Sequence, residues 1–114
     1  MSEEDRMQTL VENLIQRANA FDIDGAVALF AANAVIDDVS VGDAFVGHEG
    51  IRTYFERFFV GYNTSSRLLS LEQRGDFSAH VRLDFTGDFG HEVGILMIAI
   101  DTAGLIQRID ADLE

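Results

Sequence analysis

The spacing of apolar residues changes between Gly61 and Leu69, from the period of an α-helix to that of a β-strand. Near the start of the chain, apolar side chains recur every three or four residues, which predicts a helix over residues 4–20. Later, Val81 and Leu83 alternate with charged residues, as in a strand with one buried face. Helices followed by a meander of long strands predict an α+β fold in which the sheet wraps around the helices.

The remaining elements follow from capping and turn residues. The first half is expected to continue with a second helix capped by Asp22 or Asp24 and ending at Asn33, a strand at 35–39, a loop around Phe45, and a third helix from near Glu49 to Gly61. The second half is expected to contain strands from Leu69 to Gly75, over 79–85, over 93–100 and over 105–113. We expect one domain over residues 1–114, with no linker or repeat.

The composition of the chain excludes several classes of partner and of chemical site. The net charge is −12, from 20 acidic and 8 basic residues, and such a surface repels nucleic acids and anionic membranes. The chain has no cysteine, so it has no thiol chemistry and no Cys-type zinc site, and its three histidines lack metal-ligand spacing. We therefore expect no metal and no cofactor. The acidic N-terminus lacks the features of a signal peptide, which favours a cytoplasmic location.

Two adjacent carboxylates, Asp37 and Asp38, lie at the end of the first predicted strand. Side chains alternate between the two faces of a strand, so only one of the pair points to the interior. A carboxylate that faces an otherwise apolar cavity is a candidate proton acceptor. A strand-end carboxylate that accepts a hydrogen bond from a nearby backbone amide is the competing interpretation.

Three segments together resemble the nuclear transport factor 2-like superfamily, which includes ketosteroid isomerases, SnoaL-type polyketide cyclases and limonene epoxide hydrolase. They are Asn19-Ala-Phe-Asp-Ile-Asp-Gly-Ala-Val-Ala-Leu-Phe-Ala31, the acidic strand ending at Asp38, and Phe45-Val-Gly-His-Glu-Gly-Ile-Arg-Thr-Tyr-Phe55. The resemblance implies a cone in which a curved, mostly antiparallel sheet and three helices enclose a pocket. It also implies a homodimer formed through the outer face of the sheet, which would cover the second apolar face of residues 93–100.

The resemblance identifies Asp38 with the general base of ketosteroid isomerase. The two oxyanion donors of that enzyme correspond to Leu14 and Leu96, and a supporting tyrosine corresponds to Phe55. Loss of one such donor typically costs about 10²–10³ in rate, so efficient steroid isomerisation is not expected.

Cyclases and epoxide hydrolases of the superfamily carry a catalytic Asp on the last strand. That position corresponds to Ala111, with Asp110 and Asp112 facing outward. A bulge or a register shift of one residue would turn Asp110 or Asp112 inward instead.

We therefore expect the protein to bind a small hydrophobic molecule (polyketide-, steroid- or terpene-like) in an apolar pocket. The expected lining is Leu14, Phe30, Tyr54, Phe55, Phe59, Val81, Leu83, Leu96, Ile98, Ile109 and Ala111. Two alternatives stay open. One is isomerase or cyclase chemistry with Asp38 as general base and Tyr54, Tyr62 or a bound water as electrophile. The other is a non-catalytic ligand-binding or dimerisation module.

Overall fold

A computed structural model describes residues 3–114, with side chains from residue 6 onward. Its helical elements are α1 (Glu3–Asn19), α2 (Ile23–Val27), α3 (Gly47–Phe55) and the π-helical turn η1 (Glu56–Val60). Its strands are β1 (Phe30–Asp38), β2 (Asp43–Val46), β3 (Ser65–Gln73), β4 (Ser78–Gly87), β5 (Gly90–Ile100) and β6 (Ile106–Leu113). The predicted α+β class is confirmed.

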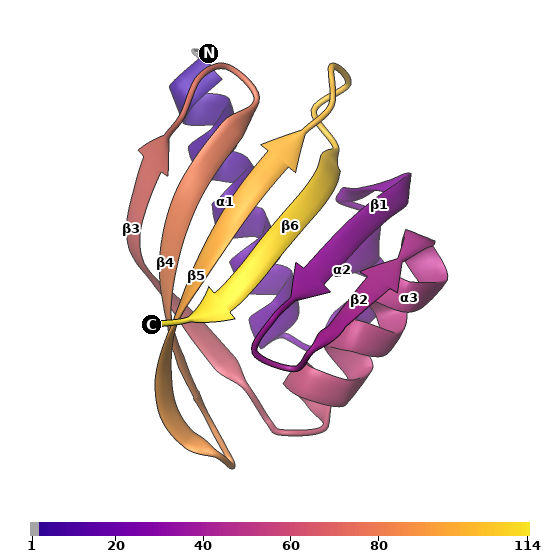
Figure 1. Cartoon of the computed structure of the whole chain (residues 1–114), viewed down its shortest axis with the longest axis vertical. Coiled ribbons are helices and arrows are strands. Elements are labelled where there is room, and N and C mark those ends of the chain that lie inside the picture. Colours follow the sequence, from indigo (N-terminus) through magenta and orange to yellow (C-terminus); the bar gives the residue numbers. More distant parts are fainter. Residues whose placement is uncertain (1–2) are drawn as a thin grey trace.

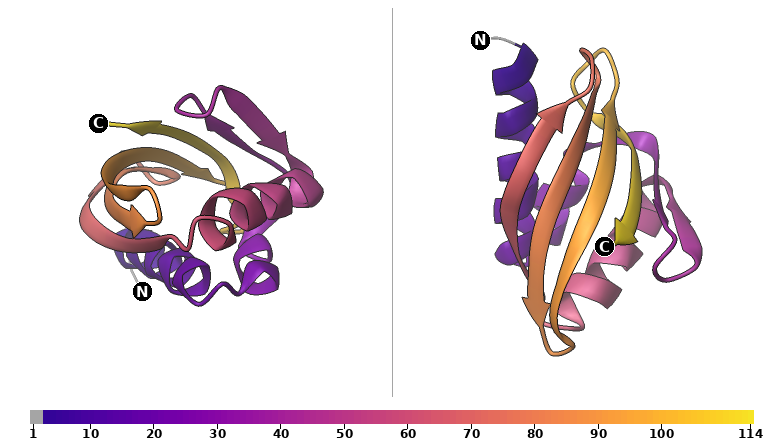
Figure 2. Two further views of the ribbon diagram at one scale, coloured as in Figure 1. Left: turned by 90° about the horizontal axis from the view of Figure 1, so that it is seen from below. Right: turned by 60° about the vertical axis from the view of Figure 1, so that its left-hand side comes forward.

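The strands form one curved six-stranded sheet in the order β2-β1-β6-β5-β4-β3 (Figure 1). Strands β1 and β6 pair in parallel, and the other neighbours pair antiparallel. Figure 2 shows the sheet curving around the helices, with α1 beside β3 and α3 beside β1. None of the helices in the described part of the chain is long and apolar enough to cross a membrane.

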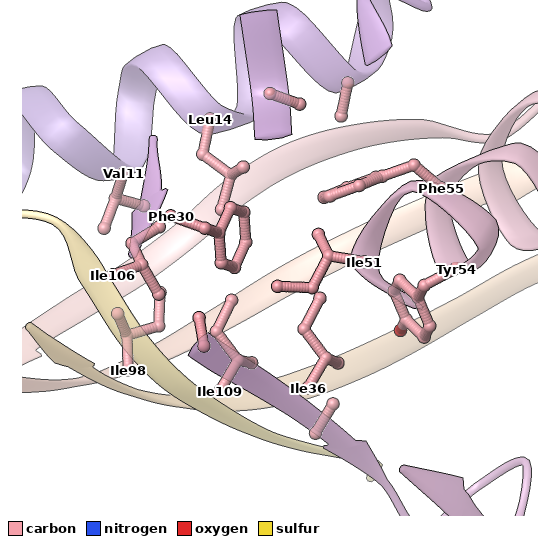
Figure 3. Close-up of a cluster of buried hydrophobic side chains, with 14 of the residues drawn as sticks. Val11, Leu14, Phe30, Ile36, Ile51, Tyr54, Phe55, Ile98, Ile106 and Ile109 are labelled. Carbon is pink, nitrogen blue, oxygen red and sulfur yellow. The ribbon is translucent and has the colours of Figure 1, made fainter. Parts of the chain in front are cut away.

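The core lies between the helices and the concave face of the sheet. Figure 3 shows Val11 and Leu14 of α1 directed toward Phe30, and Tyr54 and Phe55 extending from α3. The largest fully buried side chains are Met7, Val11, Phe30, Ile36, Ile51, Val81, Ile98 and Ile106. The apolar stripes of the helices in the first half of the chain and the apolar faces of the strands in the second half therefore pack into one core.

The prediction that the second helix reaches Asn33 is wrong. Helix α2 ends at Val27, and β1 begins at Phe30, which pairs with Ile106 of β6. The amide of Ile106 also donates to the carbonyl of Leu29 at 2.9 Å. Pairing with the last strand therefore overrides the helix propensity of the alanines in this segment.

The prediction of a loop around Phe45 is also wrong. Residues 43–46 form β2, which pairs with β1 and buries the ring of Phe45. The Phe45 ring packs against Tyr54 with a centroid distance of 5.0 Å. Strand β2 thus holds the end of β1 against α3, at the two aspartates.

Candidate functional site

Asp37 and Asp38 lie on opposite faces of β1, as the alternation of side chains predicts. Asp38 faces the interior and is only 6% exposed. Asp37 faces outward, where its carboxylate lies 3.2 Å from the guanidinium of Arg108. Strand β1 ends at Asp38, whose carbonyl accepts from the amide of Gly42 at 3.0 Å in the turn before β2.

Three donors hold the carboxylate of Asp38. Its Oδ1 accepts from the backbone amide of Ser40 at 3.0 Å and from the Ser40 hydroxyl at 2.5 Å. Its Oδ2 accepts from the hydroxyl of Tyr54 at 2.6 Å. The bonds from Ser40 are those of a strand-end cap, and the bond from Tyr54 ties β1 to α3.

The Tyr54 hydroxyl is part of this buried pair. Burial raises the pKa of Tyr54 well above its usual 10, and the negative charge and hydrogen bond of Asp38 raise it further. The Tyr54 hydroxyl therefore stays protonated at neutral pH and donates a hydrogen bond to Asp38. While it does so, this hydroxyl is not free to polarise a ligand.

Asp38 opens onto a cavity of about 320 Å³ at the end of the cone where α3 and the β4–β5 hairpin approach each other. We call it the outer cavity, and it is lined by Asp38, Ser40, Val41, Tyr54, Phe58, Phe59, Tyr62, Thr64, Phe85, Phe89, Glu92 and Leu113. The rings of Tyr62 and Phe89 meet edge to face at 6.2 Å, so the hairpin tip contacts the segment after η1. The volume lies within the range of small-molecule sites.

A second, inner cavity of about 40 Å³ lies deeper in the cone. Its lining is Leu14, Ile15, Ala18, Ile36, Tyr54, Phe55, Phe59, Ser66, Leu83, Phe85, Leu96 and Ile109. A volume of this size admits one or a few water molecules and no ring-bearing ligand. Tyr54, Phe59 and Phe85 line both cavities and so stand between them.

The structure distributes the expected lining residues over three places. Tyr54 and Phe59 lie on the wall that the two cavities share. Five of the expected residues line the inner cavity but not the outer one: Leu14, Phe55, Leu83, Leu96 and Ile109. The packed core holds Phe30, Val81, Ile98 and Ala111, which line neither cavity.

Ala111 lies beside Asp38 in the β1–β6 register, on the buried face of the last strand. Asp110 and Asp112 are exposed, as the strand alternation predicts, and Asp110 pairs with Arg108 at 2.9 Å. Among the described residues, Asp38 is thus the one aspartate that lines the outer cavity.

The sequence did not predict most of the residues that line the outer cavity. Besides Tyr62, which was considered as a hydroxyl donor, its lining includes Ser40, Val41, Phe58, Thr64, Phe85, Phe89, Glu92 and Leu113. Most of these residues lie in turns or at strand ends, where periodicity carries no information. One usable signal was the aromatic residue at the tip of the Gly87-Asp-Phe-Gly90 turn.

Comparison with known structures shows close agreement in fold. The epoxide hydrolase/cyclase-like enzyme SalBIII, described for pyran ring formation in the polyether salinomycin, has a TM-score of 0.84 at 21% identity, over 99% of this chain and 93% of its own. A putative ketosteroid isomerase from Kribbella flavida has a TM-score of 0.84 at 15% identity, over 96% and 78%. RV0760c from Mycobacterium tuberculosis, in complex with estradiol-17beta-hemisuccinate, has a TM-score of 0.82 at 17% identity, over 93% and 92%.

At these identities the likeness to solved structures establishes the fold alone. No curated protein matches the chain. The SnoaL-like domain family, in contrast, matches residues 11–104, a span from within α1 to the turn before β6. The chain therefore belongs to the SnoaL-like domain family.

Proposed function

We propose that the protein binds a small hydrophobic, ring-bearing molecule in the outer cavity, with Asp38 as the polar anchor. The observation that carries the proposal is the buried carboxylate of Asp38 at the wall of a cavity that is otherwise rich in aromatic side chains. A mostly apolar wall with a few fixed polar groups is the usual composition of a small-molecule site. The inner cavity is too small for such a ligand.

The intrinsic fluorescence of the protein provides the test. The chain has no tryptophan, and its two tyrosines, Tyr54 and Tyr62, both line the outer cavity. Titration with adamantylmethanol, a compact apolar alcohol that does not absorb with tyrosine, is expected to change the tyrosine emission saturably. Phe89→Ala is expected to weaken this binding. Leu105→Ala, an exposed leucine outside both cavities, is the matched control. Absence of saturable binding to the wild-type protein would refute the proposal.

A second candidate function is proton transfer at Asp38, favoured by the position of this carboxylate inside the cavity wall. In this mechanism Asp38 takes a proton from the carbon next to a ligand carbonyl, which leaves an enolate, and then returns the proton. The hydroxyl of Tyr54 is engaged by Asp38, so Tyr62 or a water would polarise the carbonyl. Three hydrogen bonds already occupy most of the acceptor positions of the carboxylate, which places binding ahead of catalysis.

Hydrogen exchange of a cyclic ketone distinguishes the two candidates. The α-hydrogens of tetralone in D₂O are followed by NMR, with and without the protein. Catalysis predicts faster exchange with the wild-type protein, the background rate with Asp38→Asn, and the wild-type rate with Asp37→Asn. Asp37 lies on the opposite face of the same strand and makes the comparison specific to the cavity. Equal rates for the wild type and Asp38→Asn would exclude Asp38 as the base.

We further propose that the chain forms a homodimer through the outer face of the sheet. On β5 this face carries a row of apolar side chains, Val93, Ile95, Met97 and Ala99. All four are at least partly accessible, and Met97 is 39% exposed. Ile95→Lys would place a charge in the centre of this row, so it is expected to convert a dimer into a monomer in sedimentation experiments. A wild-type protein that sediments as a monomer would contradict the proposal.

A further inference from the structure

The charged side chains that line the outer cavity are all acidic. Of the described residues that line it, Asp38 and Glu92 supply two carboxylates, and none is an arginine or a histidine. The chain contains no lysine, so arginine and histidine are its only basic side chains. Arg57 lies 5.8 Å from the ring centroid of Phe58 but is not part of the cavity wall. An anionic ligand would therefore meet two carboxylates in this site and no opposite charge.

The carboxylate of Asp38 has room for one more donor. A carboxylate accepts about four hydrogen bonds, and Asp38 accepts three from Ser40 and Tyr54. Its Oδ1 is fully used, so the remaining position is on Oδ2, beside the Tyr54 hydroxyl. A ligand group that only accepts hydrogen bonds gains nothing there, whereas an N–H or O–H group completes the set. A charged N–H donor forms the stronger bond of the two and also offsets the buried charge.

Glu92 adds a second negative charge at the rim. It shares the inner face of β5 with the buried Gly94 and Ile98, because side chains two residues apart point the same way. Among the residues that the structure describes, none forms a hydrogen bond or an ion pair with the side chain of Glu92. Its charge is therefore not neutralised within this part of the chain.

Aromatic side chains form much of the remaining wall. Phe58, Phe59, Tyr62, Phe85 and Phe89 surround the cavity, and Tyr62 and Phe89 meet edge to face. Aromatic faces attract cations as well as apolar groups, and the attraction increases when water is excluded. The net charge of −12 adds a long-range field that favours the approach of a cation.

We propose that the ligand of the outer cavity is an amphipathic amine: an apolar ring system that carries a protonated nitrogen. The ammonium group donates to Asp38 Oδ2 and lies in the field of Glu92, while the ring system packs against the aromatic wall. The inference rests on the proposed function, because it assigns the charge of the ligand that the same cavity binds.

Three probes of nearly equal shape test the charge preference: adamantylmethylamine, adamantylmethanol and adamantane carboxylate. Their affinities are compared at pH 7 through tyrosine emission, at low and at high NaCl concentration. We expect the amine to bind at least tenfold more tightly than the alcohol, the carboxylate to show no binding, and the preference for the amine to shrink in high salt. Equal or tighter binding of the alcohol would overturn the amine inference but leave the proposed function intact. If neither the amine nor the alcohol binds, both the amine inference and the proposed function are refuted.

Substitutions of single residues test which side chains cause the preference for the amine over the alcohol. Asp38→Asn is expected to lower the affinity for the amine tenfold or more and to change the affinity for the alcohol little. Glu92→Gln is expected to lower the affinity for the amine twofold to fivefold, and Asp37→Asn is the control that leaves it unchanged. If Asp38→Asn does not fold, the NMR shift of the Ser40 amide, which is bonded to Asp38, reports whether the amine binds there. A preference that survives both cavity substitutions, or an unmoved Ser40 amide, would contradict the assignment.

Discussion

Replacement of Tyr54 by phenylalanine removes one hydroxyl and leaves the packing of the ring in place. The Tyr54 side chain lies within 6.1 Å, centroid to centroid, of four phenylalanine rings, and all these contacts remain in the variant. The hydroxyl donates to Asp38 Oδ2 at 2.6 Å, a hydrogen bond to a buried charge. Bonds of this kind contribute about 1.5–3 kcal/mol. Because Ser40 still donates twice to the same carboxylate, we expect a loss near the lower end, about 2 kcal/mol.

Urea unfolding at pH 7 measures this loss. With a urea m-value of about 2 kcal/mol/M, the expected shift of the midpoint is about 1 M toward lower urea. Tyr62→Phe is the matched control, because Tyr62 lines the same cavity but its hydroxyl has no hydrogen-bonded partner among the described residues. A loss below about 0.5 kcal/mol for Tyr54→Phe, or an equal loss for Tyr62→Phe, would refute the assignment of the bond's contribution.

The raised pKa of Tyr54 predicts how the stability of the fold depends on pH in the alkaline range. The pKa of Tyr54 is raised in the folded protein, whereas an unfolded tyrosine ionises near 10. Its contribution is therefore complete below pH 10 and is lost as the pH rises toward the folded-state pKa. We expect the wild-type protein to lose stability above pH 10 more steeply than Tyr54→Phe. Parallel curves for the two proteins would show that the phenol is not buried against Asp38.

Three further predictions concern other parts of the fold. A Cβ at Gly94 would lie 2.4 Å from the ring of Phe85, so Gly94→Ala should displace this ring, reduce stability by about 1–3 kcal/mol in thermal unfolding and weaken binding in the outer cavity. The Asn19 side chain exchanges two hydrogen bonds, of 2.7 and 2.9 Å, with the backbone of β3, so Asn19→Ala should cost about 1–3 kcal/mol in urea unfolding. Arg67, and to a lesser degree His91, lower the pKa of Asp84, so in a carboxyl NMR titration Arg67→Ala should raise it toward 3.8.

The sequence predicted most of the fold because the apolar periods are long and regular. The alternation in β4 was strong enough to assign its inward residues. In β6 the sequence left a register shift of one residue open, and the structure places Ala111 inward between the outward Asp110 and Asp112. The prediction failed where a short segment depends on a distant partner. Residues 30–33 are strand only because Ile106 lies beside Phe30, and β2 is strand only because β1 is its neighbour.

The sequence predicted the carboxylate of the candidate site but not its hydrogen-bonded partner or the open cavity beside it. The alternation of side chains showed that one of the two adjacent aspartates faces inward, and the resemblance to ketosteroid isomerase singled out Asp38. The bond from Tyr54 to Asp38 joins α3 to β1, and no pattern in either segment specifies that contact. Whether a cone is open or filled depends on how side chains from six strands and three helices pack, and composition does not determine this.

The place of β6 in the sheet has a consequence for how the protein is made. Strand β6 lies between β1 and β5, so before residues 106–113 leave the ribosome, β1 has only the four-residue β2 beside it. Asp38 then lacks the neighbour, Ala111, that aligns it in the finished sheet. The cavity therefore forms late, through contacts between residues more than 70 positions apart, and such non-local pairing is slow. Short deletions from the end of β6 are expected to dismantle the candidate site and to leave the helical half of the chain with an exposed apolar face.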